Sequence, residues 1–315
     1  MIEVKNIVKR YGDKFAVNDI SFKIDTGEIV GFLGPNGAGK STTMNILTGY
    51  LSATSGTAVI DGIDILEDPT AAKKLIGFLP EQPPLYMDMT VKEYLNFVYD
   101  LKGCKFARKE HLQEICALIK IEDVYGRMIK NLSKGYRQRV GFAQALVGNP
   151  PVLILDEPTV GLDPRQIIEI RNLIQRLGKK HTVILSTHIL QEVQSVCDRI
   201  IVINKGQLIA DGTADTLTYK TAGNRRLVAR IAGGKNDVKK AVRAMDGVLF
   251  VDDLGQKESG SHDFLIESEP SVDIRKPLFR MLSERGWVLM GLKSMDMSLE
   301  DVFVNLIANE GGADA

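Results

Sequence analysis

The chain has 315 residues, enough to bury a substantial core and to form two domains. Apolar residues make up 44% and charged residues 25%, which is ordinary for a globular protein and argues against a low-complexity chain. Forty basic and forty acidic residues give a formal net charge of zero, which argues against a protein that coats nucleic acid but leaves a local basic patch open.

The cysteines and the hydropathy of the chain indicate in which cellular compartment the protein is expected. The cysteines Cys104, Cys116 and Cys197 are odd in number and show no C-x-x-C pairing, which predicts reduced thiols in a cytosolic protein. The first residues lack an apolar signal-peptide core, and no run reaches 18 apolar residues. We therefore expect a chain that is not secreted and does not cross a membrane by itself.

The first chemical motif is a glycine-rich turn between a strand and a helix. The apolar run 29–33 predicts a strand, and Gly34-Pro-Asn-Gly-Ala-Gly-Lys-Ser41 after it fits the pattern G-x-x-x-x-G-K-[ST]. Glycines let backbone N–H groups surround phosphate oxygens, and a helix that begins near Lys40 directs its positive end at them. Lys40 can neutralise the β- and γ-phosphates, and the Ser41 hydroxyl can bind Mg²⁺. The motif therefore predicts a nucleotide site.

Residues from about 83 to 149 read as mainly helical. Thr90 and Glu93 have the spacing of a capping box, and an apolar stripe follows them. The stripe consists of Tyr94, Leu95, Val98 and Leu101.

The segment LSKGYRQRVGFAQAL, residues 132–146, begins polar and continues with helical periodicity. Ser133 is placed to cap that helix, and the free N–H groups of Lys134, Gly135 and Tyr136 form an anion site. The glycine-rich turn already holds phosphates from one side. A second anion site in one chain therefore suggests a second chain, whose nucleotide faces this helix start.

The run 152–155 is continuously apolar, as in a parallel strand that is buried on both faces. It delivers Asp156 and Glu157 at its carboxyl end, where ligands lie in open α/β sheets. Because neighbouring strand residues point to opposite sides, we expect different roles for the two carboxylates. Asp156 is placed to hold Mg²⁺ through water, and Glu157 to polarise the attacking water as a general base. The alternative is that Asp-Glu-Pro is merely the polar end of a strand that enters a turn, and the glycine-rich turn upstream disfavours it.

A third strand, around residues 183–185, ends in Ser186-Thr187 before His188 begins a helix. An imidazole at this strand end can donate a hydrogen bond to the γ-phosphate. We predict structural roles for the other histidines, His111, His181 and His262.

Gly223-Asn224 marks a change of composition and a domain boundary. The segments beyond it alternate in the order strand (227–231), helix (238–245), strand (248–251), strand (264–267), helix (274–285) and strand (288–292). That order predicts a small ferredoxin-like α+β unit. Ser298, with Asp301 three residues on, is placed to cap a last helix.

These motifs, in this order, resemble the ATP-binding subunits of ABC transporters over about residues 1–220. Gly34–Ser41 is similar to the Walker A loop, 152–157 to Walker B with its catalytic glutamate, 132–136 to the LSGGQ signature, 161–164 to the D-loop and His188 to the switch histidine. The signature departs from the pattern, with Lys134 in place of a glycine and Tyr136 in place of the glutamine. Ser133 and Gly135 remain.

The resemblance implies a site shared by two chains. Gln82 is similar to the Q-loop glutamine, which contacts Mg²⁺ and the attacking water, and Tyr11 matches the aromatic residue that stacks on adenine. The implied ATP contacts are Tyr11, Gly34, Pro35, Asn36, Gly37, Ala38, Gly39, Lys40, Ser41 and Thr42 of one chain with Ser133 and Gly135 of the other. Ser41, Gln82 and Asp156 would hold Mg²⁺, and Glu157, His188 and Gln82 would act in catalysis.

The resemblance also implies the architecture. We expect an α/β P-loop ATPase of ABC type over residues 1–220, with an N-terminal antiparallel β subdomain and a helical subdomain at about 83–149. A small α+β domain would follow over 225–312. Its ending Leu-Glu-Asp-Val-Phe, residues 299–303, resembles the C-terminal extension of ABC-2 type export ATPases, which is thought to help dimerise or regulate.

The implied function is ATP hydrolysis that drives export. Two copies, or one copy and a paralogous subunit, would enclose two Mg-ATP and drive a separate integral membrane permease. The chain would then lie at the inner face of the cell membrane, with no nucleic-acid partner. The alternatives are a soluble ABC-type ATPase of translation or DNA repair, another P-loop class such as a kinase, and a module that binds ATP without hydrolysing it. The sequence does not indicate which substrate is transported.

Overall fold

A computed structural model describes residues 1–221, 225–295 and 299–309. The chain forms two compact units, Met1–Thr213 and Ala214–Ala315, which are described separately. The predicted boundary at Gly223-Asn224 and the predicted cap Ser298 lie outside the described residues.

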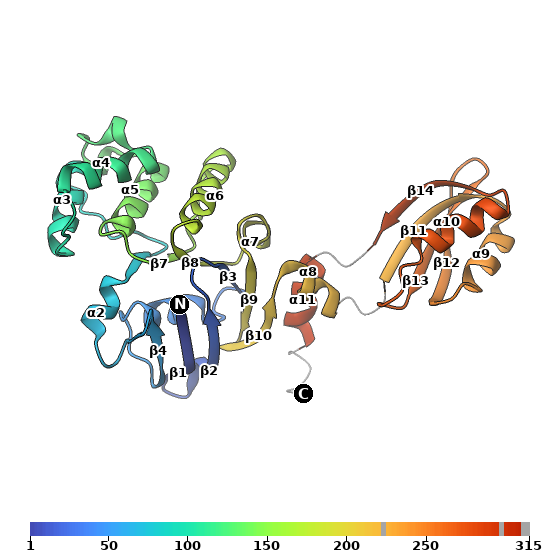
Figure 1. The fold of residues 1–315 in the computed structure, drawn as a ribbon, viewed down its shortest axis with the longest axis horizontal. Coiled ribbons are helices and arrows are strands. Elements are labelled where there is room, and N and C mark those ends of the chain that lie inside the picture. The colour runs from blue at the N-terminus through green and yellow to red at the C-terminus, as the bar shows by residue number, and fades with distance from the viewer. Residues whose placement is uncertain (222–224, 296–298, 310–315) are drawn as a thin grey trace. The chain divides into compact units, whose positions relative to one another are not determined.

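The first unit begins with an antiparallel sheet of strand order β2-β1-β4-β5 (Figure 1). Its strands are β1 (Ile2–Tyr11), β2 (Lys14–Ile24), β4 (Ser55–Ile60) and β5 (Ile63–Asp64). Gly12 makes the tight connection between β1 and β2 with φ of 58°, a conformation that glycine adopts without strain. This sheet confirms the predicted antiparallel β subdomain.

The central sheet has the order β10-β9-β3-β8-β7-β6, and all neighbours are parallel except the pair β9 and β10. Its strands are β3 (Ile29–Leu33), β6 (Ile76–Leu79), β7 (Val152–Asp156), β8 (Thr182–Thr187), β9 (Arg199–Asn204) and β10 (Gln207–Gly212). Every residue of β3, β7 and β8 is buried, which is why these strands read as continuous apolar runs.

The two faces of the central sheet contribute to two different cores. Val152 and Ile154 of β7 pack in the core shared with the antiparallel sheet and helix α1 (Lys40–Leu47). Leu153 and Leu155 pack in the core shared with α6 (Pro164–Gly178) and the helical segment. The short helix α7 (Leu190–Val196) follows β8. The functional strand ends therefore emerge from a sheet that is packed on both sides.

The helical segment, within about residues 83–149, contains α3 (Val91–Leu101), α4 (Arg108–Ile119) and α5 (Lys134–Leu146), with short 3₁₀ turns at Glu122–Val124 and Ile129–Asn131. The short helix α2 (Pro69–Lys74) precedes β6 and packs through Ala72 in the core of the antiparallel sheet. The predicted capping box of Thr90 and Glu93 is confirmed, because each side chain bonds the other residue's backbone N–H. Leu101 departs from the predicted stripe. It is 74% exposed at the last turn of α3, where no neighbouring element covers it.

The second unit contains α8 (Ala214–Thr221), β11 (Arg225–Ala232), α9 (Lys235–Arg243), β12 (Val248–Glu258), β13 (Ser261–Ser268), α10 (Arg275–Glu284), β14 (Val288–Ser294) and α11 (Leu299–Asn309). The strands form an antiparallel sheet of order β12-β13-β11-β14. Val238 of α9 and Leu278 of α10 pack with Ile231, Phe264 and Ile266 of the sheet. The extra C-terminal sheet therefore exists, with longer strands than the sequence predicted.

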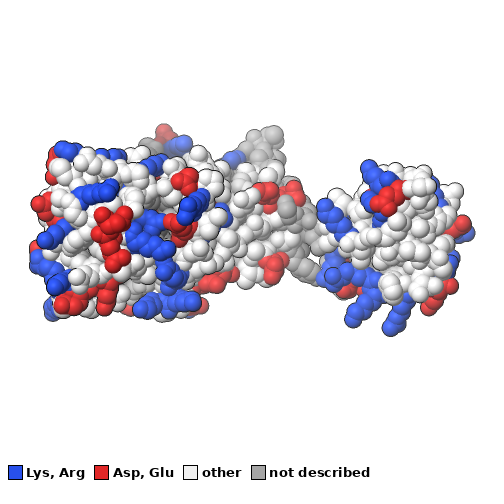
Figure 2. Space-filling model, turned by 90° about the horizontal axis from the view of Figure 1, so that it is seen from above, with Lys and Arg blue, Asp and Glu red and all other residues white. Residues whose placement is uncertain are grey.

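The surface carries both signs of charge. Figure 2 shows basic and acidic side chains interspersed over the face of Met1–Thr213 that is in view. Within the described ranges, no helix combines the length and the apolar character that a bilayer crossing requires.

Candidate functional site

The glycine-rich turn lies between β3 and α1 and is held by close backbone contacts. A Cβ atom at Gly34 would lie 2.3 Å from the carbonyl oxygen of Ile203, and one at Gly39 would lie 2.5 Å from that of Ala16. Gly39 also has φ of 110° at the N-cap of α1. Both positions therefore require glycine, because any larger residue would displace neighbouring backbone.

Lys40 points back into this turn. Its Nζ donates hydrogen bonds to the carbonyl oxygens of Gly34 (2.8 Å) and Pro35 (3.2 Å). The side chain is 6% exposed, and its ammonium lies 3.5 Å from Oε1 of Glu157. The turn thus places one buried positive charge where a phosphate group would lie.

Glu157 lies just beyond β7 and has φ of 48°. Its N–H donates to the carbonyl of Ser186 on the neighbouring strand (2.8 Å). The strand alternation that we used to separate the two carboxylates does not reach this residue, because the left-handed backbone turns its side chain. Its carboxylate accepts from Nδ1 of His188, at 3.0 Å and 2.9 Å from the two oxygens. The Glu157 carboxylate therefore lies between the Lys40 ammonium and the His188 ring and contacts both.

Asp156 is buried at the end of β7, and within the described part of the chain its Oδ1 has no hydrogen-bond partner. Burial raises the pKa of Asp156, while the hydroxyls of Ser186 and Ser41 and the charge of Lys40 act in the opposite direction. An unpartnered carboxylate oxygen near a serine hydroxyl fits a divalent cation that takes most of its shell from phosphate and water. Among the described residues, no group of three or more His, Cys, Asp and Glu forms a metal cage.

A pocket of about 290 Å³ opens beside the glycine-rich turn. Its lining includes the predicted residues Tyr11, Asn36, Gly37, Gly39, Lys40, Ser41, Thr42 and Glu157. Tyr11 is 53% exposed at the pocket, and the ammonium of Lys9 lies over its ring, 5.2 Å from the ring centroid. Of the other predicted residues, Gly34 and Pro35 contribute carbonyls to Lys40, and Ala38 is 2% exposed in the core.

The structure does not bring Gln82 to this pocket. Its neighbour Glu81 lines the pocket instead, while Gln82 is exposed and lines a different cavity of about 490 Å³ with Phe78 and Lys102. Sequence reasoning missed Glu81, although it stands in the same loop, because a loop residue has no periodicity to fix its direction.

Ser133 caps α5 as predicted, since its side chain accepts from the N–H of Tyr136 at 3.4 Å. Lys134 is exposed, and its Nζ lies against Gly161, where an added Cβ would be 1.9 Å away. Tyr136 donates its hydroxyl proton to Asp123 (2.7 Å). Of the two substituted signature residues, Tyr136 therefore bonds within its own chain, and Lys134 lies beside Gly161.

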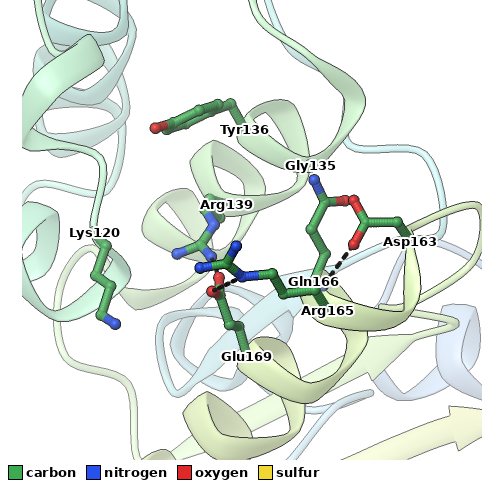
Figure 3. A pocket seen from close by; sticks show the side chains of 8 residues that line it. All are labelled: Lys120, Gly135, Tyr136, Arg139, Asp163, Arg165, Gln166 and Glu169. Carbon is green, nitrogen blue, oxygen red and sulfur yellow. Dashed lines mark hydrogen bonds and ion pairs between the residues drawn. The ribbon is translucent and has the colours of Figure 1, made fainter.

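Gly135 and Tyr136 line a second pocket of about 340 Å³, separate from the one at the glycine-rich turn. Figure 3 shows Arg139 and Arg165 directed at Glu169 on α6. A Cβ at Gly135 would lie 2.7 Å from the side chain of Gln166, so α5 and α6 approach closely here. The signature residues thus lie apart from the phosphate turn of the same chain.

The loop after β7 is also held by residues that the sequence did not single out. The Gln138 amide of α5 donates to the carbonyl of Pro158 (3.0 Å), and both groups are buried. Thr159, in the same loop, donates to the buried carboxylate of Glu192. Single-sequence periodicity marks Gln138 and Glu192 only as helix residues.

A glycine-rich turn between strand and helix, with a buried lysine beside the carboxylates of a neighbouring strand, defines a P-loop nucleotide-binding protein. The family model described as ABC transporter matches residues 17–160. The chain is 36% identical to the uncharacterised ABC transporter ATP-binding protein YxlF of Bacillus subtilis, over 98% of this chain and 99% of that protein. It therefore belongs to the ABC transporter ATP-binding proteins.

Further comparisons agree. The chain is 31% identical to the bacitracin transport ATP-binding protein BcrA of Bacillus licheniformis, over 98% of this chain and 97% of that one. A solved dimeric ATP-binding cassette, in a post-hydrolysis state with ADP and Pi, is 29% identical with a TM-score of 0.62. It covers 68% of this chain, and this chain covers 98% of it. The prediction of an ABC transporter ATPase that binds and hydrolyses ATP is confirmed.

Proposed function

We propose that this ATPase drives an ABC-2 type exporter through a separate integral membrane permease, at the inner face of the cell membrane. Support comes from relatives that match nearly the whole chain, C-terminal unit included. One of them is named for bacitracin transport, and another, LnrL of Bacillus subtilis, for linearmycin resistance at 31% identity over 97% of this chain. Removal of such compounds from the cell requires export. We expect no nucleic-acid partner.

Two copies would complete each active site. The observation that carries this proposal is that Ser133 and Gly135 do not line the pocket of the phosphate turn in their own chain, while Gly135 lines a separate pocket. In a dimer, the N–H groups at the start of α5 would meet the γ-phosphate bound by the other copy. Related cassettes have been solved as dimers.

Within each site, Tyr11 would stack on adenine, and the N–H groups of residues 34–42 would surround the phosphates. Lys40 would exchange its carbonyl partners for phosphate oxygens. That exchange would separate its ammonium from Glu157, which would then take a proton from the attacking water. His188, already bonded to Glu157, would hold the γ-phosphate from the other side.

Ser41 and Asp156 would hold Mg²⁺, which supplies positive charge to the β- and γ-phosphate oxygens. Gln82 remains a predicted ligand and catalytic residue. The position of Glu81 at the pocket supports the alternative that this carboxylate, rather than the neighbouring amide, meets the metal or the water.

The C-terminal unit is proposed to be ferredoxin-like and to help dimerise or regulate the ATPase. The element order β11-α9-β12-β13-α10-β14 and the sheet order support that fold. The predicted limits, 1–220 for the ATPase domain and 225–312 for this domain, stay a prediction.

The test is the mass of the purified chain by light scattering, with and without Mg-ATP. We expect Glu157→Gln to accumulate as a dimer, because ATP binds but is not hydrolysed, while the wild type stays monomeric. Adding Ser133→Arg to Glu157→Gln should abolish that dimer and leave ATP binding to the single chain intact. A dimer that survives Ser133→Arg would contradict the shared site.

A further inference from the structure

Glu192 is a buried carboxylate that the mechanism above does not use. It is 1% exposed and lies on the buried face of α7, beside Val193 and Val196. An apolar residue would complete that face at lower cost, because a buried carboxylate must be hydrogen-bonded to be tolerated. The role of Glu192 therefore depends on the residues that donate hydrogen bonds to its carboxylate.

Both partners are threonines next to the catalytic strand ends. Thr159 donates to Oε1 of Glu192, and Thr187 donates to Oε2 at 3.0 Å. Thr159 lies two residues after Glu157, and Thr187 directly precedes His188. One carboxylate therefore joins the loop after β7 to the last residue of β8, next to the positions of Glu157 and His188.

At one end, the same connection also holds the backbone around His188. The Thr187 hydroxyl also accepts from the N–H of Ile189 (3.1 Å), so it fixes the chain on either side of His188. On the other loop, Glu157 holds a left-handed φ of 48°. A strained backbone conformation of that kind persists only where packing and hydrogen bonds from the surrounding residues hold it in place.

We propose that Glu192 is a positioning residue, which sets the separation of Glu157 and His188 through Thr159 and Thr187. The proposal rests on the catalytic roles proposed for Glu157 and His188. Small displacements of catalytic groups have large kinetic effects. Glu192 therefore controls turnover through the positions of Glu157 and His188, without contacting the nucleotide.

The first test measures geometry and needs no turnover. The full chain is labelled with ¹⁵N-histidine, and the ring signal of His188 is identified by its loss in His188→Ala. We expect Thr159→Val to shift the His188 ring signal, and Thr159→Ser, which keeps the hydroxyl, to leave it in place. Thr159 lies on the opposite loop, so an unchanged His188 signal in Thr159→Val overturns the proposal.

The second test measures ATP turnover and separates positioning from folding. We expect Thr159→Val to lower kcat about 10-fold with an almost unchanged KM for ATP, and Thr159→Ser to restore kcat. In a His188→Ala background, Thr159→Val should cause no further loss. An equal further loss there, accompanied by a lower Tm, would assign Thr159 and Glu192 to folding and overturn the proposal.

The two tests also separate this proposal from the proposed function. If Glu157→Gln leaves turnover intact, the role proposed for Glu157 fails. The His188 ring signal in Thr159→Val then still decides whether Glu192 sets the geometry of the two loops.

Discussion

Replacing Asp156 by asparagine should stabilise the protein while it impairs the response to Mg-ATP. Asp156 is 5% exposed with an unpartnered Oδ1, and burial raises its pKa. Leaving a buried polar atom without a partner costs about 1–3 kcal/mol. The amide keeps that unpartnered atom but carries no charge, so it avoids the additional cost of burying an anion, and we expect a gain of about 1–2 kcal/mol in the asparagine variant. For a unit of this size, that gain raises Tm by about 2–8 °C.

The pH dependence has a defined sign. A carboxyl whose pKa is raised in the folded state is less stable there as an anion than it is in the unfolded chain. The penalty is complete above the raised pKa of Asp156 and disappears as the pH falls below the unfolded value near 3.8. The advantage of Asp156→Asn should therefore be constant at neutral pH and shrink as the solution is acidified.

Thermal unfolding of the nucleotide-free chain, followed from neutral to mildly acidic pH, measures both effects. Mg-ATP should raise the Tm of the wild type more than that of the variant, because the variant lacks a charged ligand. Asp13→Asn is the matched control, since Asp13 is fully exposed at the β1–β2 turn and its change should leave Tm almost unchanged. An Asp156→Asn variant that is less stable than wild type without nucleotide would refute the reasoning.

Three further predictions concern the pocket. Gly34→Ala should lower ATP affinity more than 10-fold in a fluorescent-nucleotide titration, because its Cβ meets backbone, whereas Gly37→Ala, which faces open space at φ of 79°, should cost about 1 kcal/mol. Tyr11→Ala should weaken ATP binding by about 1–3 kcal/mol and Tyr11→Phe by much less, since the stacking surface is kept; equal losses would contradict stacking. Glu81→Ala should lower kcat more than Gln82→Ala does in a steady-state ATPase assay, and the reverse order would return the role to Gln82.

The buried strands and the helix starts were predictable because local chemistry decides them. Strands β3 and β7 are covered on both faces, which leaves uninterrupted apolar runs in the sequence. Thr90 and Ser133 cap helices within one turn of chain, so their partners are three residues away. The glycine-rich turn is likewise complete within one short segment.

Other features depend on residues that are distant in the sequence. The direction of Glu157 follows from a left-handed backbone that the carbonyl of Ser186 anchors from the neighbouring strand. Glu192 reads as one polar residue in a helix until Thr159 and Thr187 are brought to it. Whether Glu81 or Gln82 faces the pocket depends on the path of a loop, and a loop has no periodic sequence pattern from which that path could be predicted. In each case, the side chain's direction or partners can be predicted only from the tertiary structure.

The charges at the pocket would link the binding of nucleotide to the release of the proposed base, Glu157. One ammonium, that of Lys40, lies beside two buried carboxyl groups, those of Asp156 and Glu157. A triphosphate would add negative charge, which the proposed divalent cation at Asp156 would offset together with the ammonium of Lys40. Once that ammonium turned to phosphate, Glu157 would keep His188 as its partner, and its carboxylate would be open to the attacking water. The proposed step that binds ATP therefore also prepares the group that hydrolyses it.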